Sequence, residues 1–142
     1  MKILLAVDGS KSSLDAVDCL VAHADWYRDK PQVELVTVHL PVPKLPRMGL
    51  VIGKGQIQRY YEEEGAANLA KAKKKLDAAG VPYREKVLVG PVAESIVAHA
   101  EKVKADLIFV GTRGMTAAAN ALMGSVATKI LHIATVPVML VK

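Results

Sequence analysis

Short runs of consecutive apolar residues alternate along the chain with stretches in which apolar residues recur every three or four positions. The runs are typical of strands buried on both faces, and the three-to-four spacing is typical of amphipathic helices. Strands are predicted over Ile3 to Val7, Val33 to Leu40, Tyr83 to Val89, Leu107 to Val110 and Val136 to Val141. Because strands and helices alternate, we expect parallel pairing through right-handed crossovers, which is an α/β fold.

Four helices are predicted between these strands. They are expected from Ser10 to Ala24, from Gln56 to Ala79, from Pro91 to Val103 and from Gly124 to Ile133. Ser10 or Asp8 can cap the first helix, and Gly80 is a suitable stop for the second. Residues Pro41 to Gly55 contain three prolines and three glycines, so we expect a long loop there. The loop is basic, and whether it leans over a ligand stays open.

The length of 142 residues suits one domain, and no repeat or linker divides it, so we expect a single domain over residues 1–142. The net charge of +5 is modest, and the lysines of the second helix follow three glutamates without interleaved aromatic residues. A solvated helix face explains them better than a nucleic-acid surface. The single cysteine, Cys19, excludes a disulfide within the chain and a cysteine-rich zinc cluster.

No apolar run is long enough for a signal peptide or a membrane span. We therefore expect a cytoplasmic protein that does not bind a membrane.

The candidate chemistry lies where the predicted strands end. In open α/β sheets, ligands bind beyond the carboxyl ends of the strands. There the chain has Gly111, two residues, Gly114, nine residues and then Gly124-Ser125. Glycines allow a tight turn and a close approach to a ligand, and the first N–H groups of a helix attract phosphate. This spacing predicts a phosphate cradle closed from two sides.

The same residues carry a resemblance to a known family. The segment Gly111 to Gly114 followed by Gly124-Ser125, the opening Ile3 to Ser10 and the ending Thr135 to Val141 are similar to the ATP-binding branch of the universal stress proteins. The resemblance covers the whole chain in length and element order. It implies a doubly wound five-stranded parallel sheet in the order 3-2-1-4-5, of the adenine-nucleotide-hydrolase type, with helices on both faces.

The resemblance also implies a role for individual residues. Asp8 would contact the ribose or a Mg²⁺ ion carried by the phosphates. The residues expected to surround an adenine nucleotide are Ala6, Val7, Asp8, Leu40, Val110, Gly111, Arg113, Gly114, Gly124, Ser125, Val126 and Ala127. Many relatives have a hydroxyl residue at the position of Ala127, so one phosphate donor is missing here. The plainer alternatives are that Asp8 only caps a helix and that Arg113 is an ordinary surface residue.

Three functions remain open at this point. The first is a non-catalytic ATP-binding module in stress response or signalling, with unknown protein partners. The second is a slow Mg²⁺-dependent ATP hydrolase, although no nucleophile–base pair or acidic metal cluster is evident and His39 is better explained as a packed strand-end residue. The third is an interaction module of the same family that binds no nucleotide, against which the complete glycine spacing argues.

The last strand, Val136 to Val141, is expected at an edge of the sheet. An uncapped apolar edge favours pairing with another chain. Family members of this type look like homodimers joined through this strand. We therefore predict a homodimer.

Overall fold

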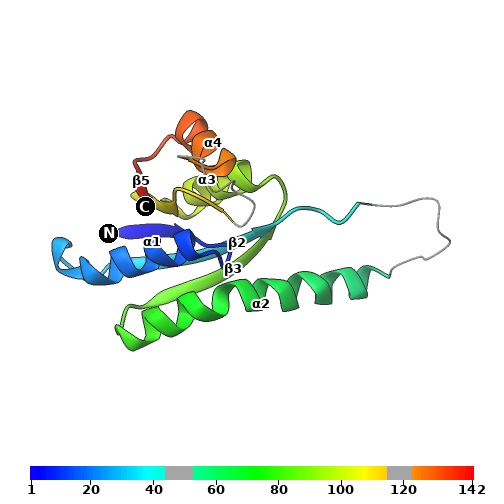
Figure 1. The fold of residues 1–142 in the computed structure, drawn as a ribbon, viewed down its shortest axis with the longest axis horizontal. Coiled ribbons are helices and arrows are strands. Elements are labelled where there is room, and N and C mark those ends of the chain that lie inside the picture. Colours follow the sequence, from blue (N-terminus) through cyan, green and yellow to red (C-terminus); the bar gives the residue numbers. More distant parts are fainter. Residues whose placement is uncertain (44–52, 115–122) are drawn as a thin grey trace.

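The computed structural model describes residues 1–43, 53–114 and 123–142. In these residues, five strands form one parallel sheet in the order β3-β2-β1-β4-β5 (Figure 1). The strands are β1 (Lys2–Ala6), β2 (Gln32–His39), β3 (Tyr83–Val89), β4 (Leu107–Gly111) and β5 (Val138–Val141). The predicted fold class and strand order are thereby confirmed.

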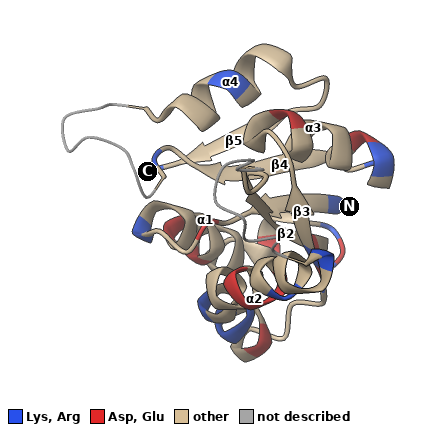
Figure 2. Ribbon diagram, turned by 90° about the vertical axis from the view of Figure 1, so that its right-hand side faces the viewer, with Lys and Arg blue, Asp and Glu red and all other residues tan. Residues whose placement is uncertain are grey.

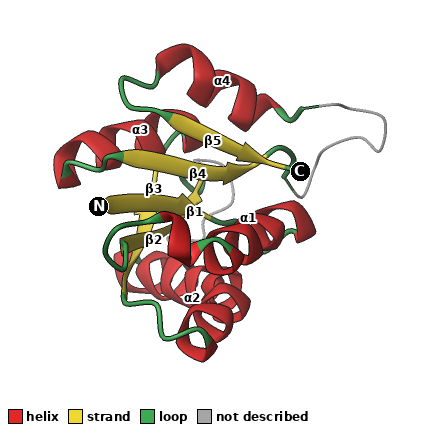
Figure 3. Cartoon of the chain, turned by 90° about the vertical axis from the view of Figure 1, so that its left-hand side faces the viewer, coloured by secondary structure: helices red, strands yellow, loops and turns green. Residues whose placement is uncertain are grey.

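Four α-helices connect the strands and cover both faces of the sheet. They are α1 (Lys11–Ala22), α2 (Lys54–Ala78), α3 (Val92–Val103) and α4 (Ser125–Ile133), with a short 3₁₀ turn η1 (Ala24–Trp26) after α1. Figure 3 shows α1 and α2 on one face and α3 and α4 on the other. The two layers follow from the alternation of side chains along each strand, which sends neighbouring residues to opposite faces.

Each face of the sheet has its own apolar core. Ile3 and Leu5 of β1 pack with Phe109 of β4 under α1 and α2, whereas Leu4 of β1 and Ile108 of β4 pack under α3 and α4. All five side chains are almost completely buried. Burying a side chain of this size contributes about 1.5 to 3 kcal/mol, so the two cores hold the sheet rigidly and with it the loops at its ends.

The element boundaries depart from the predicted ones at a few positions. The long helix α2 begins at Lys54, two residues before the predicted start, with Gly53 as its N-cap. Strand β2 ends at His39, so Leu40 lies outside it. Most of the predicted Pro41 to Gly55 loop, residues 44–52, lies outside the described residues, as do residues 115–122 of the predicted cradle. Among the helices of the described residues, none has the length and hydropathy needed to cross a lipid bilayer.

Candidate functional site

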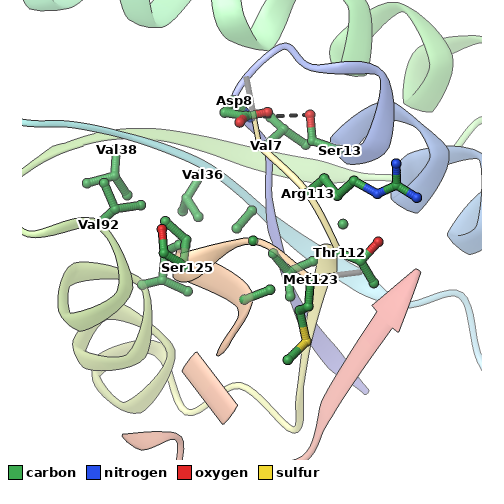
Figure 4. Close-up of a pocket in the computed structure, with 18 residues that line it drawn as sticks. Val7, Asp8, Ser13, Val36, Val38, Val92, Thr112, Arg113, Met123 and Ser125 are labelled. Atoms are coloured by element: carbon green, nitrogen blue, oxygen red, sulfur yellow. Dashed lines mark hydrogen bonds between the residues drawn. The ribbon is translucent and has the colours of Figure 1, made fainter. Parts of the chain in front are cut away.

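A cavity of about 280 Å³ opens at the carboxyl ends of β1 and β4. From β1 the chain adds β2 and β3 on one side, and it then crosses to add β4 and β5 on the other. Between β1 and β4 the loops therefore leave in opposite directions, which is where open α/β sheets form their binding crevices. Figure 4 shows residues from β1, β2, β4, α3 and α4 converging on this cavity.

The structure brings together eleven of the twelve residues predicted for the site. The cavity is lined by Ala6, Val7, Asp8, Val110, Gly111, Arg113, Gly114, Gly124, Ser125, Val126 and Ala127. Leu40 is the exception: it does not line the cavity, and 67% of its surface is exposed. The strand ends at His39, so Leu40 lies beyond the sheet.

Sequence reasoning missed the apolar half of the cavity. Val36 and Val38 of β2 and Val92 and Ile96 of α3 form one side of it. Val36 and Val38 are two positions apart on one strand face, and Val92 and Ile96 are four apart on one helix face. These spacings were available in the sequence, but both pairs also fit a plain apolar core. Ser13, Thr112 and Met123 complete the lining.

The main chain of Val38 supplies hydrogen-bonding groups to this apolar half. Along β2, the peptide groups of even-numbered residues face β1, as the hydrogen bonds Gln32 N to Met1 O and Val7 N to Val36 O establish. In the described residues the ladder toward β1 ends with the bond to Val36, because β1 stops at Ala6. The N–H and C=O of Val38, one step farther along, therefore face the cavity as an adjacent donor and acceptor.

The other half of the cavity is polar and lies at the start of α4. Gly124 is the N-cap of this helix, with extended backbone angles, and its N–H donates to the carbonyl of Thr112 over 2.7 Å. That bond holds the helix start against the loop that follows β4. The N–H groups of Ser125, Val126 and Ala127 belong to the first turn of α4, where no acceptor within the helix is available. They form a donor cluster at the cavity wall.

The three glycines of the predicted cradle lie in different steric surroundings. A Cβ at Gly111 would lie 2.4 Å from the backbone carbonyl oxygen of Ser12 in α1, so this glycine, which also lines the cavity, permits the close packing of α1. A Cβ at Gly114 would lie 3.0 Å from Oδ2 of Asp8. At Gly124, a Cβ would make only ordinary contacts of 3.4 Å or more.

Asp8 organises the turn between β1 and α1. Its Oδ1 accepts a hydrogen bond from Ser10 N over 2.9 Å. Its own N–H donates to Ser13 Oγ over 3.3 Å, a bond that Figure 4 marks between these two residues. The helix cap is Ser10, whose Oγ accepts from Ser13 N over 3.2 Å. Asp8 lines the cavity and is thus held beside Gly114.

Arg113 contacts the start of α1 through its main chain. Its N–H donates to Ser12 Oγ over 3.2 Å. The side chain is exposed, and Figure 4 shows its guanidinium group pointing away from Ser125. In this arrangement Arg113 borders the cavity without reaching into its polar half.

Helices α3 and α4, which carry two walls of the cavity, are joined by an ion pair between Lys129 and Glu94. The hydrogen bond from Lys129 lowers the pKa of the Glu94 carboxyl below its ordinary value.

Across the described ranges 1–43, 53–114 and 123–142, His, Cys, Asp and Glu residues form no group of three that could hold a metal ion. His39 faces α2, where its ring lies 6.0 Å from that of Tyr61. It is therefore on the opposite side of the sheet from the cavity.

Comparisons with known proteins agree with this architecture. The model of the universal stress protein family matches residues 1–142. The universal stress protein MJ0531 of Methanocaldococcus jannaschii is 36% identical over 141 residues, which cover 99% of this chain and 81% of that protein.

Two solved structures extend the comparison. The hypothetical protein MJ0577, from the same organism, superposes with a TM-score of 0.81 at 26% identity, covering 99% of this chain and 94% of that one. A universal stress protein in complex with cAMP superposes with a TM-score of 0.72 at 26% identity, covering 100% of this chain and 97% of that one. With the whole length matched in sequence and in fold, the chain belongs to the universal stress protein family.

Proposed function

We propose that the cavity binds an adenine nucleotide, with ATP as the physiological ligand and Mg²⁺ carried on its phosphates near Asp8. The protein would act as a non-catalytic module in stress response or signalling, in which nucleotide binding changes how the chain associates with its partners. The observation that carries the proposal is the division of one cavity into an apolar half with a main-chain donor and acceptor and a polar half built on a helix N-terminus.

The apolar half suits an adenine base. The Watson–Crick edge of adenine carries a donor, the N6 amino group, next to an acceptor, N1. The C=O and N–H of Val38 are complementary to that pair, since each backbone peptide group offers one acceptor and one donor. Val36, Val92 and Ile96 supply apolar surface for the faces of the ring. Ligand pockets of this kind are mainly apolar, with a few polar groups that fix orientation.

The polar half suits the phosphates. The N–H groups at the start of α4 and the Ser125 hydroxyl are donors, and the positive end of the helix dipole favours an anion. Ser125 is exposed at the cavity wall, so a phosphate can reach it. Asp8 lines the same cavity, so its carboxylate can accept hydrogen bonds from the ribose hydroxyl groups or face a metal ion carried by the phosphates. A similar protein solved in complex with cAMP supports the same class of ligand.

The proposal is tested by calorimetric titration of the purified protein with ATP, compared with the variant Gly124→Asp. A carboxylate at this position would lie beside the phosphates, where two like charges about 4 Å apart repel by about 4 kcal/mol at an effective dielectric constant of about 20. We expect binding to be lost by a factor of at least about 100. The fold should survive, because a Cβ at Gly124 meets only ordinary contacts.

Gly55→Asp is the matched control. The same residue is introduced at an exposed glycine of α2 with no atom within 4 Å of the added Cβ, outside the cavity lining. This variant should bind ATP as the wild type does. Wild-type protein that binds no adenine nucleotide, or a Gly124→Asp variant with unchanged affinity, would contradict the proposed site. Turnover of radiolabelled ATP by the wild type would instead favour the hydrolase alternative.

A further inference from the structure

A second cavity, of about 490 Å³, adjoins the first. It is lined by Gly9, Ser10, Lys11, Ser12 and Asp15 at the start of α1, by Thr112, Arg113 and Gly114 after β4, and by Lys142 after β5. We call it the α1 cavity. It shares Thr112, Arg113 and Gly114 with the first cavity, so these three residues form a common wall.

The α1 cavity is basic. Among its lining residues, Lys11, Arg113 and Lys142 have cationic side chains and Asp15 has a carboxylate. Figure 2 shows the C-terminal end of the chain beside the start of α1, with basic residues at both places. Lys11 pairs with Asp15 over 3.8 Å, and its side chain is 93% exposed, so this ion pair is weak. The amine of Lys11 can therefore turn to an anion at little cost.

The common wall contains a glycine and an arginine. Gly114 has no side chain, and the guanidinium group of Arg113 points away from Ser125 (Figure 4). A phosphate chain that starts at the polar half of the first cavity meets Gly114 at its border. Gly114 also lines the α1 cavity, together with the three cationic residues.

We propose that the α1 cavity receives the terminal phosphates of a nucleotide whose base and ribose occupy the first cavity. The inference rests on the proposed function and adds a selectivity to it. Lys11, Lys142 and Arg113 bind the distal phosphates, so nucleoside triphosphates bind more tightly than nucleoside monophosphates. A monophosphate ends at the start of α4 and does not reach these residues.

The test is calorimetric titration with AMP, ADP and ATP in the presence of EDTA, so that Mg²⁺ does not neutralise the phosphates. Wild-type protein is compared with the double variant Lys11→Gln/Lys142→Gln, neither residue of which lines the first cavity. The double variant Lys71→Gln/Lys74→Gln is the matched control, because it removes the same two charges from exposed positions of α2, and neither residue lines either cavity. Thermal melting of each variant verifies that it is folded.

We expect wild-type affinity to rise from AMP through ADP to ATP. The double variant should lose about tenfold in ATP affinity and less than about twofold in AMP affinity, as charge-assisted bonds to the distal phosphates are removed. Lys71→Gln/Lys74→Gln should bind all three as the wild type does. Equal wild-type affinity for AMP and ATP, or an equal loss of both in the double variant, overturns the inference and leaves the proposed function standing. Failure of all three nucleotides to bind overturns both.

Discussion

Alanine in place of Gly111 should destabilise the protein through the contact between β4 and α1. The added Cβ would lie 2.4 Å from the carbonyl oxygen and 2.6 Å from the carbonyl carbon of Ser12, and a backbone group cannot rotate aside. Forcing a methyl group into packed structure costs about 1 to 3 kcal/mol. Replacing a glycine restricts the unfolded chain, which offsets about 0.4 to 1 kcal/mol. The net loss should therefore be about 1 to 2 kcal/mol.

Thermal unfolding followed by far-ultraviolet circular dichroism measures this loss. For a chain of this length we expect the melting temperature to fall by about 3 to 7 °C. Adding Ser12→Ala to the variant should restore little, because the Ser12 carbonyl group, and not its hydroxyl group, makes the shortest contact.

Gly124→Ala is the comparison, since its backbone angles of φ −77° and ψ 158° suit alanine and its Cβ would be at least 3.4 Å from other atoms. Its stability should stay within about 0.5 kcal/mol of the wild type. An unchanged melting temperature for Gly111→Ala would refute the packing role that the structure assigns to this glycine.

Three further predictions concern helix packing, assembly and pH. Gly65→Ala should destabilise the protein by about 1 kcal/mol despite the better helix propensity of alanine, because a Cβ there would lie 2.4 Å from Val87 Cγ2. Gly55→Ala, in the same helix, has open space around the added Cβ and should not destabilise the protein. Urea unfolding of both variants checks this difference. Strand β5 is an edge of the sheet, so we expect two chains to pair through it and the protein to be a homodimer in light scattering at micromolar concentration. Leu140→Pro should convert the dimer to a monomer. A monomeric wild type would exclude this mode of assembly. The lowered pKa of Glu94 means that its ion pair stabilises the fold above about pH 4.5 and that this stabilisation is lost as the pH falls. The melting temperature of Glu94→Gln should therefore be lower than that of the wild type at about pH 7 and equal to it at about pH 3.

The sequence predicted the sheet well because parallel strands covered on both sides are continuously apolar. The runs around Leu4 and Ile108 have that pattern, and the glycine spacing after β4 located the crevice between β1 and β4. Those signals are local, and the topology of an α/β sheet brings their ends together without further information.

The remainder of the site depends on where strands stop relative to one another, which local patterns do not encode. Leu40 was predicted in the site from the family resemblance, on a strand expected to run from Val33 to Leu40, yet the strand ends at His39 and the cavity is bordered by Val38. The pairs Val36–Val38 and Val92–Ile96 have the spacing of any core face, so only the assembled structure separates them from it. Similarly, the close approach of Gly111 to Ser12 involves residues that are far apart in the sequence.

The early end of β1 makes the strand beside it chemically different from its neighbours. Because the exposed peptide groups of Val38 belong to the main chain, replacement of this valine by isoleucine or leucine leaves them in place and changes only the room around them. Substitutions of this side chain can thus widen or narrow the cavity while the main-chain donor and acceptor of Val38 stay in place. To remove this donor and acceptor from the cavity, β1 would have to be about two residues longer and pair with Val38, which requires an insertion rather than a substitution.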